Sequence, residues 1–173
     1  MGIYQFIIQD WEANSINTKG RIFSTFFRIA NLPSGNILAR IVLLPFRIFY
    51  KLIFEWILGI EIPHQVKIGA GLTVYHLPAI VIHRDVVIGK NCVLRQSTTI
   101  GNKTDNGACP VIGNNVNIGA SVCILGDVVI GDNVVIGAGS VVVKSIPANS
   151  IVVGNPARII KNTQIHQTPE PVI

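Results

Sequence analysis

Apolar positions follow a period of six along the second part of the chain. Thirteen six-residue units between Ile62 and Val142 begin with Ile, Val or Leu, and glycine often follows at the second position. A fixed six-residue period is typical of a parallel β-helix, in which three units form one triangular coil. Ordinary helices and strands would repeat about every 3.6 or 2 residues. We therefore predict a mainly-β fold built on a parallel β-helix, with the glycines forming its tight corners.

The six-residue repeat breaks twice. Eight residues instead of six separate Val74 from Ile82, and this stretch contains His76. The second break, residues 102–110, lies between Ile100 and Ile112 and predicts a loop that projects from the coils and can reach a neighbouring molecule. Because breaks in a repeat often carry function, both are candidate site segments.

The first part of the chain has helical spacing of its Phe, Leu and Ile residues. Asp10 is expected to cap a helix that starts near Glu12. A second helix is expected over residues 37–58, with Pro45 kinking or splitting it. Its polar positions form a narrow basic stripe on an apolar helix. Such a helix either packs on the rest of the protein with its charges solvated, or lies on an anionic membrane surface.

These patterns divide the chain into three predicted segments. Residues 1–60 form a small N-terminal α-helical domain that covers one end of the β-helix, because a solenoid needs its ends covered. Residues 61–160 form the β-helix, and residues 161–173 a polar C-terminal tail.

Composition narrows the function classes. Of 173 residues, 49% are apolar and 13% charged, which predicts a sizeable core. No uncharged apolar run is long enough to predict a spanning helix. The net charge of +5 comes without a Lys/Arg block, so we expect no nucleic-acid partner. Three cysteines without a CxxC motif predict neither a disulfide framework nor a structural zinc site. We expect a cytoplasmic protein, with attachment to the inner face of the membrane as a further hypothesis.

Four motifs resemble a known family. They are Val74-Tyr75-His76, the segment 94–101, the segment 136–142 and Gly154-Asn155-Pro156-Ala157-Arg158. Together they resemble the hexapeptide-repeat acetyltransferases of the serine acetyltransferase type. The segments 10–15 and 105–113 are most similar to those of the small acetyltransferases of colanic acid and capsule clusters. The resemblance implies a left-handed β-helix, a homotrimer, and acetyl-CoA bound in a cleft between two subunits.

The resemblance also assigns roles to residues. His76 falls on the family's catalytic histidine, and Glu61 on the acidic residue that orients it. Imidazole suits a general base because its pKa lies near the working pH. Asp10 falls on an acceptor-contacting residue of the serine enzymes. The expected activity is acetyl transfer from acetyl-CoA to a hydroxyl group.

Three positions depart from the serine enzymes. Tyr75 replaces an aspartate, Ala108 replaces the arginine that grips the serine carboxylate, and Cys109 replaces a second active-site histidine. Tyr75 and Cys109 are therefore candidate acceptor-binding residues. We expect the acceptor to be a sugar hydroxyl of a capsular or other surface glycan, or of its precursor. Serine O-acetylation is the alternative, and the terminal Ile173, common among serine acetyltransferases, favours it.

Small and basic residues are the candidate contacts for acetyl-CoA. Small side chains leave room for the pantetheine arm, and a backbone N–H near Gly101 and Asn102, at the start of the second break, can bind the oxyanion. Lys and Arg near the C-terminal end can pair with the CoA phosphates or simply aid solubility. The candidate cofactor residues are Gly101, Asn102, Ala120, Ala138, Lys144 and Arg158.

Other chemistries fit the pattern less well. A zinc site would need ligands at other spacings than those of His64, His76 and His83, so we expect no metal. Cys109 could be a nucleophile activated by His76, although such a cysteine more often packs as a small apolar group. A non-catalytic trimeric scaffold is a further alternative, which the pairing of His76 with Glu61 disfavours.

Overall fold

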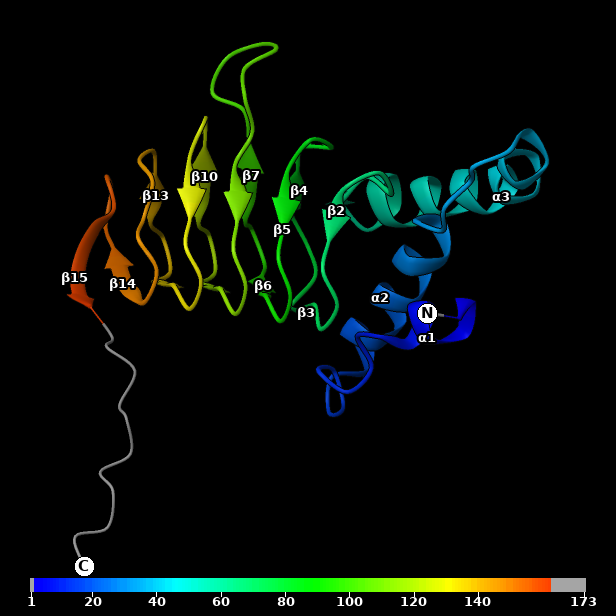
Figure 1. The fold of residues 1–173 in the computed structure, drawn as a ribbon, viewed down its shortest axis with the longest axis horizontal. Coiled ribbons are helices and arrows are strands. Elements are labelled where there is room, and N and C mark those ends of the chain that lie inside the picture. The colour runs from blue at the N-terminus through cyan, green and yellow to red at the C-terminus, as the bar shows by residue number, and fades with distance from the viewer. Residues whose placement is uncertain (1, 163–173) are drawn as a thin grey trace, which may run out of the picture.

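A computed structural model describes residues 2–162 (Figure 1). Four helical elements gather at one end of the molecule: α1 (Ile3–Ile8), α2 (Thr18–Ala30), α3 (Ile37–Tyr50) and the π-helical η1 (Lys51–Ile57). We call them together the N-terminal cap. Ile173 and nearly all of the predicted tail lie outside the described residues.

Within residues 2–162, fifteen strands follow the cap and form a triangular prism. They are β1 (Ile60–Glu61), β2 (Lys67–Ile68), β3 (Thr73–Tyr75), β4 (Ile80–Ile82), β5 (Val87–Ile88), β6 (Val93–Arg95), β7 (Thr99–Gly101), β8 (Val111–Ile112), β9 (Asn117–Ile118), β10 (Cys123–Leu125), β11 (Val129–Ile130), β12 (Val135–Ile136), β13 (Val141–Val142), β14 (Ser150–Val153) and β15 (Arg158–Asn162). Three sheets form its faces, with strand orders β1-β4-β7-β10-β13, β11-β8-β5-β2 and β15-β14-β12-β9-β6-β3. The predicted mainly-β fold, a parallel β-helix with N-terminal helices, is confirmed.

Strand register shows how the two breaks change the coils. Partners on neighbouring coils are 18 residues apart where the period holds, as for Ile82 and Ile100. The first break widens this spacing to 20 residues, between Glu61 and Val81. The second break widens it to 24, between Thr99 and Cys123. Its extra residues leave the prism as a loop that projects beyond β7 in Figure 1, as predicted.

The interior of the prism is a stack of apolar side chains. One ladder contains Ile68, Ile88, Ile112 and Ile130, at most 8% exposed, on the four strands of one face. Because every coil repeats this arrangement, each buried side chain lies between similar side chains of the coils on both sides. Burying one such side chain contributes roughly 1.5–3 kcal/mol.

The corner conformation differs from the sequence-based expectation. The left-handed backbone at one corner of successive coils belongs to Asn91, Asn115, Asn133 and Asn149, with φ of 56–59°. Asparagine tolerates this region better than most residues. The repeated glycines instead allow neighbouring coils to approach closely: a Cβ on Gly69 would lie 2.7 Å from the carbonyl carbon of Gly89 on the next coil. The glycine corners are therefore tight because a Cβ would clash there, whereas the left-handed backbone belongs to asparagine.

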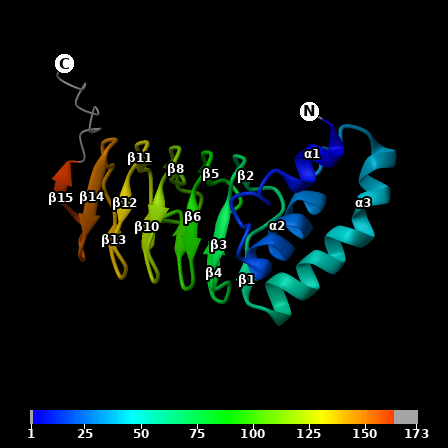
Figure 2. The same ribbon diagram turned by 90° about the horizontal axis from the view of Figure 1, so that it is seen from below.

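The first coil is the edge of all three sheets, and the cap covers it (Figure 2). Arg28 of α2 is buried and donates hydrogen bonds to the backbone oxygens of Ile68 (2.7 Å) and Gly69 (2.6 Å). Asp10 pairs with the Arg28 guanidinium and accepts the N–H groups of Gly71 and Leu72, each at 2.9 Å. These polar side chains satisfy strand groups that would otherwise be unpaired at an open edge.

Further side chains of the cap contact the same coil. The Asn14 amide donates to the Leu72 oxygen (2.7 Å) and the Asn17 amide to the Val74 oxygen (2.8 Å). The Tyr50 hydroxyl donates to the Ile62 oxygen at 2.8 Å. The expected covering of this end of the β-helix by the N-terminal helices is thus seen in atomic contacts.

The start of α2 differs from expectation. Residues 9–16 form turns, and α2 begins later than predicted, with Asn17 rather than Asp10 as its N-cap. The Asn17 side chain accepts the Gly20 N–H at 3.1 Å. Pro45 lies inside α3, and the π-helical η1 follows directly after Tyr50. At the other end β15 extends to Asn162, so the first two residues assigned to the tail lie in a strand.

Candidate active site

The eight-residue break places His76 on an outer corner of the prism. β3 ends at Tyr75, and the extra residues hold His76 with a φ of +52° and an exposed side chain. A non-glycine residue in this region carries local strain, and such strain is concentrated at functional sites. The extra residues of the break thus place the His76 imidazole at the surface, at a position that a regular coil does not have.

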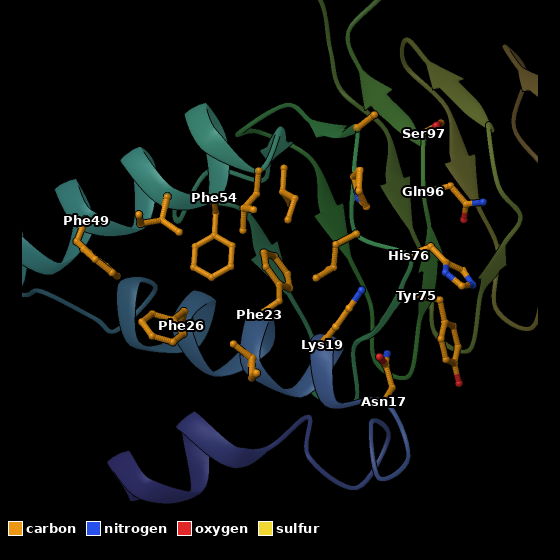
Figure 3. A pocket seen from close by; sticks show the side chains of 17 residues that line it. Asn17, Lys19, Phe23, Phe26, Phe49, Phe54, Tyr75, His76, Gln96 and Ser97 are labelled. Atoms are coloured by element: carbon orange, nitrogen blue, oxygen red, sulfur yellow. The ribbon is translucent and has the colours of Figure 1, made fainter.

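His76 lies at one end of a cavity of ≈ 1010 Å³ between the cap and the first coils (Figure 3). The lining near His76 is polar and includes Asn17, Lys19 and Gln96. The lining toward the cap is aromatic and apolar, with Phe23, Phe26, Phe49 and Phe54. The cavity therefore combines a polar end that carries a base with a large apolar end.

Gln96 is a site residue that the sequence analysis did not single out. It follows Arg95, the register partner of Tyr75, so it lies one coil away from His76. Its Oε1 atom is buried and accepts no hydrogen bond from any described residue. A buried acceptor without a partner has a desolvation cost that a bound donor would remove. The only signal in the sequence is its place directly after a strand, one coil beyond the first break.

Tyr75, a candidate acceptor-binding residue, also lines this cavity. The guanidinium of Arg95 lies 5.7 Å from the centre of its ring. This cation–π contact holds the tyrosine ring against the next coil. The structure thus brings Tyr75 and His76 together.

Asp10 is placed differently from its expected role. Its side chain is fully buried, and its two oxygens bind Arg28 and the first coil. No face of this carboxylate is open to an acceptor. We therefore correct the expected acceptor contact: Asp10 holds the cap on the β-helix.

Glu61 is not joined to His76. Among residues 2–162 no hydrogen bond or ion pair links the two side chains, and Glu61 lines a second cavity of ≈ 510 Å³. His83, Gly101 and Asn102 line that cavity as well. The orienting role of Glu61 for His76 is therefore not supported by the geometry of a single chain.

Cys109 contacts a different histidine from the one expected. Its Sγ lies 3.1 Å from Nδ1 of His83, and the backbone N–H of Asp85 donates to the same nitrogen at 3.3 Å. Burial and the Asp85 carboxylate raise the pKa of the Cys109 thiol, although a hydrogen bond from the Asn102 backbone opposes this. The arrangement favours a protonated thiol, which is a poor nucleophile. Activation of Cys109 by His76 finds no support in these contacts.

Five of the six candidate cofactor residues lie at or near the two ends of strands in the β1-β4-β7-β10-β13 sheet. Ala120 and Ala138 lie three residues before strands β10 and β13, at the corner of the prism that carries His76 and Gln96. Backbone hydrogen bonds connect this corner, from Ser121 N–H to the Gln96 oxygen and from Gly139 N–H to the Ala120 oxygen.

The other candidates lie elsewhere. Gly101 and Asn102 lie at the C-terminal end of β7, on the side of the sheet opposite to Ala120 and Ala138. Lys144 lies just after the C-terminal end of β13, on the same side as Gly101. Arg158 begins β15 near the C-terminal end and is exposed. Within the described part of the chain, no group of three or more His, Cys, Asp or Glu side chains could hold a metal ion. Within the same part, no helix is both long and apolar enough to cross a membrane.

Comparison with known proteins identifies the family. The family model described as bacterial transferase hexapeptide (six repeats) matches residues 109–144. A protein of Escherichia coli K12 with the name colanic acid biosynthesis acetyltransferase WcaB is 42% identical over 158 residues, which are 88% of this chain and 98% of that protein. The chain belongs to the hexapeptide-repeat acetyltransferases. It is accordingly an acetyltransferase.

Other members of the hexapeptide-repeat acetyltransferases are similar over shorter stretches or in structure. Mitochondrial serine acetyltransferase 3 of Arabidopsis thaliana is 48% identical over 96 residues, 54% of this chain and 25% of that one. The soybean serine acetyltransferase structure is 28% identical, with a TM-score of 0.75, and the match covers 91% of this chain and 69% of that chain. A Neisseria gonorrhoeae serine acetyltransferase structure has a TM-score of 0.76 at 27% identity, over 94% of this chain and 68% of that one.

Proposed function

We propose that the chain transfers acetyl groups from acetyl-CoA to a sugar hydroxyl of a surface glycan or of its precursor, with His76 as the general base. The observation that carries this proposal is the exposed His76 at the polar end of a large cavity. The name of the E. coli relative, which assigns it to colanic acid biosynthesis, supports a glycan acceptor.

The reaction needs a base at the acceptor oxygen. His76 takes the hydroxyl proton as the acceptor oxygen attacks the thioester carbonyl carbon and a new C–O bond forms. The carbonyl oxygen becomes an oxyanion that backbone N–H groups can stabilise. The C–S bond then breaks, and the imidazolium returns its proton to the CoA thiolate. The products are the acetyl ester and free CoA.

Gln96 favours a sugar as the acceptor. A sugar presents several hydroxyl donors, and the buried Oε1 of Gln96 needs one. The Lys19 ammonium supplies donors on the opposite wall of the cavity. Such a set can fix the orientation of a polyhydroxylated ring.

A homotrimer forms part of this proposal. Gly101 and Asn102 line a different cavity from His76, at the opposite end of the strands of the β1-β4-β7-β10-β13 sheet. The family resemblance implies a cleft between two copies of the chain. In such a cleft, His76 of one copy and Gly101 with Asn102 of the other can contact the same acetyl-CoA. The projecting loop of residues 102–110 is suited to reach the neighbouring copy.

An acceptor competition tests the proposal. Purified full-length protein receives labelled acetyl-CoA with either capsule-type oligosaccharides or L-serine, and both free thiol and acetylated product are followed. We expect transfer to the oligosaccharide, reduced about 10²–10⁴-fold in His76→Ala. His64→Gln is the matched control, because His64 lines neither cavity. Equal activity of His76→Ala and the wild type would refute the assignment of the base.

L-Serine is the second candidate acceptor. The identity to plant serine acetyltransferase and the structural similarity to the soybean enzyme favour it. Asp10 does not, because its carboxylate is enclosed by Arg28 and the first coil. Efficient acetylation of serine in the same assay, without transfer to oligosaccharide, would replace the glycan by serine.

A further inference from the structure

One face of α3 and η1 is apolar and exposed to solvent. We call it the outer face; its members are at least 46% exposed, and they are Ile37, Leu38, Ile41, Val42, Leu44, Ile48, Leu52, Trp56 and Ile57. The opposite side of the same helices packs inward through Tyr50 and Phe54. Figures 1 and 2 both place α3 at the end of the molecule away from β15.

The outer face is larger than isolated surface hydrophobics would produce. At about 1.5 Å per residue, a helical stretch of this length extends roughly 30 Å. Its most exposed side chains are Trp56, at 74%, and Ile37 and Ile57, each at 71%. Contiguous apolar surfaces of this kind on soluble proteins mark interaction sites.

The exposed charges of α3 and η1 beside the outer face are basic. The sequence contains no acidic residue between Glu12 and Glu55. Arg40 and Lys51 are exposed on the helices themselves, and Lys19 is exposed on α2. Glu55 is the single acidic residue of α3 and η1, and burial followed by the charge of Glu61 raises its pKa, against the lowering effect of Lys51.

We propose that the outer face docks on the surface of an anionic lipid bilayer. The apolar side chains enter the boundary between headgroups and acyl chains, with Trp56 at the level that indole prefers. Arg40 and Lys51 then approach the lipid phosphates, and each basic residue adds to the attraction. This inference goes beyond the acetyl transfer proposed above and does not depend on the identity of the acceptor.

The charge pattern favours lipid over a second copy of the chain. A symmetric contact through the outer face would bring the basic flank of one copy to the basic flank of the other. Like charges across an interface disfavour association. An anionic bilayer supplies the opposite charge and also covers the apolar side chains.

Vesicle sedimentation tests the docking. The full chain is mixed at low and high salt with vesicles of phosphatidylcholine alone or of phosphatidylcholine with phosphatidylglycerol. We expect the protein to pellet with the anionic vesicles, and less so at high salt because the charges are screened. The emission of Trp56, followed in a Trp11→Phe background, is expected to shift to shorter wavelength on binding. Failure to pellet with either vesicle would overturn the proposal.

Matched variants locate the surface. Ile41→Glu with Ile48→Glu changes two exposed side chains of the outer face and is expected to lower the bound fraction at least about tenfold. Ile16→Glu, at a side chain that is 92% exposed outside this face, is the control and should bind as the wild type does. Circular dichroism verifies that each variant folds.

Two results with these variants would contradict membrane docking. One is equal vesicle binding by the double variant and by Ile16→Glu. The other is a smaller particle mass of the double variant in the absence of lipid, which would assign the outer face to a contact between copies of this chain.

Discussion

The N-terminal cap and the coils are stabilised by different kinds of interaction. In the coils, similar apolar side chains stack on one another, and backbone hydrogen bonds repeat from strand to strand. In the cap, a few polar side chains reach the first coil, and Arg28 with Asp10 makes several of these contacts. In a repeat, many equivalent residues share the stabilisation. In the cap, a few residues provide it, and no repeating sequence pattern identifies them.

The largest expected effect is on the cap. Arg28→Leu leaves the Asp10 carboxylate buried without its partner, which should lower the free energy of unfolding by about 3–5 kcal/mol. Denaturant unfolding measures this loss, and hydrogen exchange should increase over residues 60–75 but not in the distant coils. Arg40→Gln, on an exposed arginine, is the control. Adding Asp10→Asn should recover part of the loss, and no recovery would argue against a charge effect.

A core substitution in the middle coils should have a similar or smaller effect, spread differently. Ile118→Ala on β9 removes a fully buried side chain and should lower the free energy of unfolding by about 2–5 kcal/mol. Hydrogen exchange should increase on both neighbouring strands, β6 and β12, because each coil supports the next. Val129→Ala, at an exposed position, should change stability by less than about 0.5 kcal/mol. Exchange confined to β9 would contradict the idea that coils share their stabilisation.

The corner asparagines should contribute less. Asn115 has a φ of 56°; its Oδ1 accepts a hydrogen bond from the Asn91 amide at 3.2 Å, and its own amide donates to Oδ1 of Asn133 at 3.0 Å. Asn115→Ala loses these bonds and the tolerance of left-handed backbone, at a cost of about 1–2 kcal/mol. Asn115→Gly keeps the conformation and should cost less. Thermal unfolding separates the two, and a glycine variant no more stable than the alanine variant would exclude the conformational part.

The smallest effect concerns acid stability at the junction of cap and coil. Burial, followed by the charges of Arg47 and Lys51, lowers the pKa of His64 below its ordinary value of 6.5. The unfolded chain then binds the proton more readily, so this contribution is present above pH 6.5 and is lost as the pH falls through 6.5 toward the folded pKa. The melting temperature of His64→Gln should decrease less on acidification than that of the wild type. Parallel pH profiles would show that His64 does not titrate in this way.

The coils were predictable because their physics is periodic. The six-residue period from Ile62 to Val142 follows from stacking identical coils, and both breaks appear at the predicted places. The reason for the repeated glycines could not be predicted in detail, because a glycine that avoids a neighbouring coil and one that adopts left-handed backbone look alike in a sequence. The φ values, at asparagine rather than at these glycines, resolve this.

The cap and the site were predictable only in part. Arg28 has the same sequence appearance as any basic residue of an amphipathic helix, and only the packing shows that it is buried. His76 was found because it lies in a break of the repeat. Gln96 was missed because its role depends on register across coils, and Glu61 was expected beside His76 although the prism places it in another cavity.

The cap precedes the coils in the sequence, and this order also governs their synthesis. A ribosome releases residues 3–57 before the first coil, so the surface that pairs with β1, β2 and β3 emerges ahead of them. Each later coil then finds a completed coil as its template. During synthesis the growing prism therefore has unpaired sheet edges only at the end where the next coil will be added. A nascent chain on a neighbouring ribosome can pair with this one end, because the cap already covers the other.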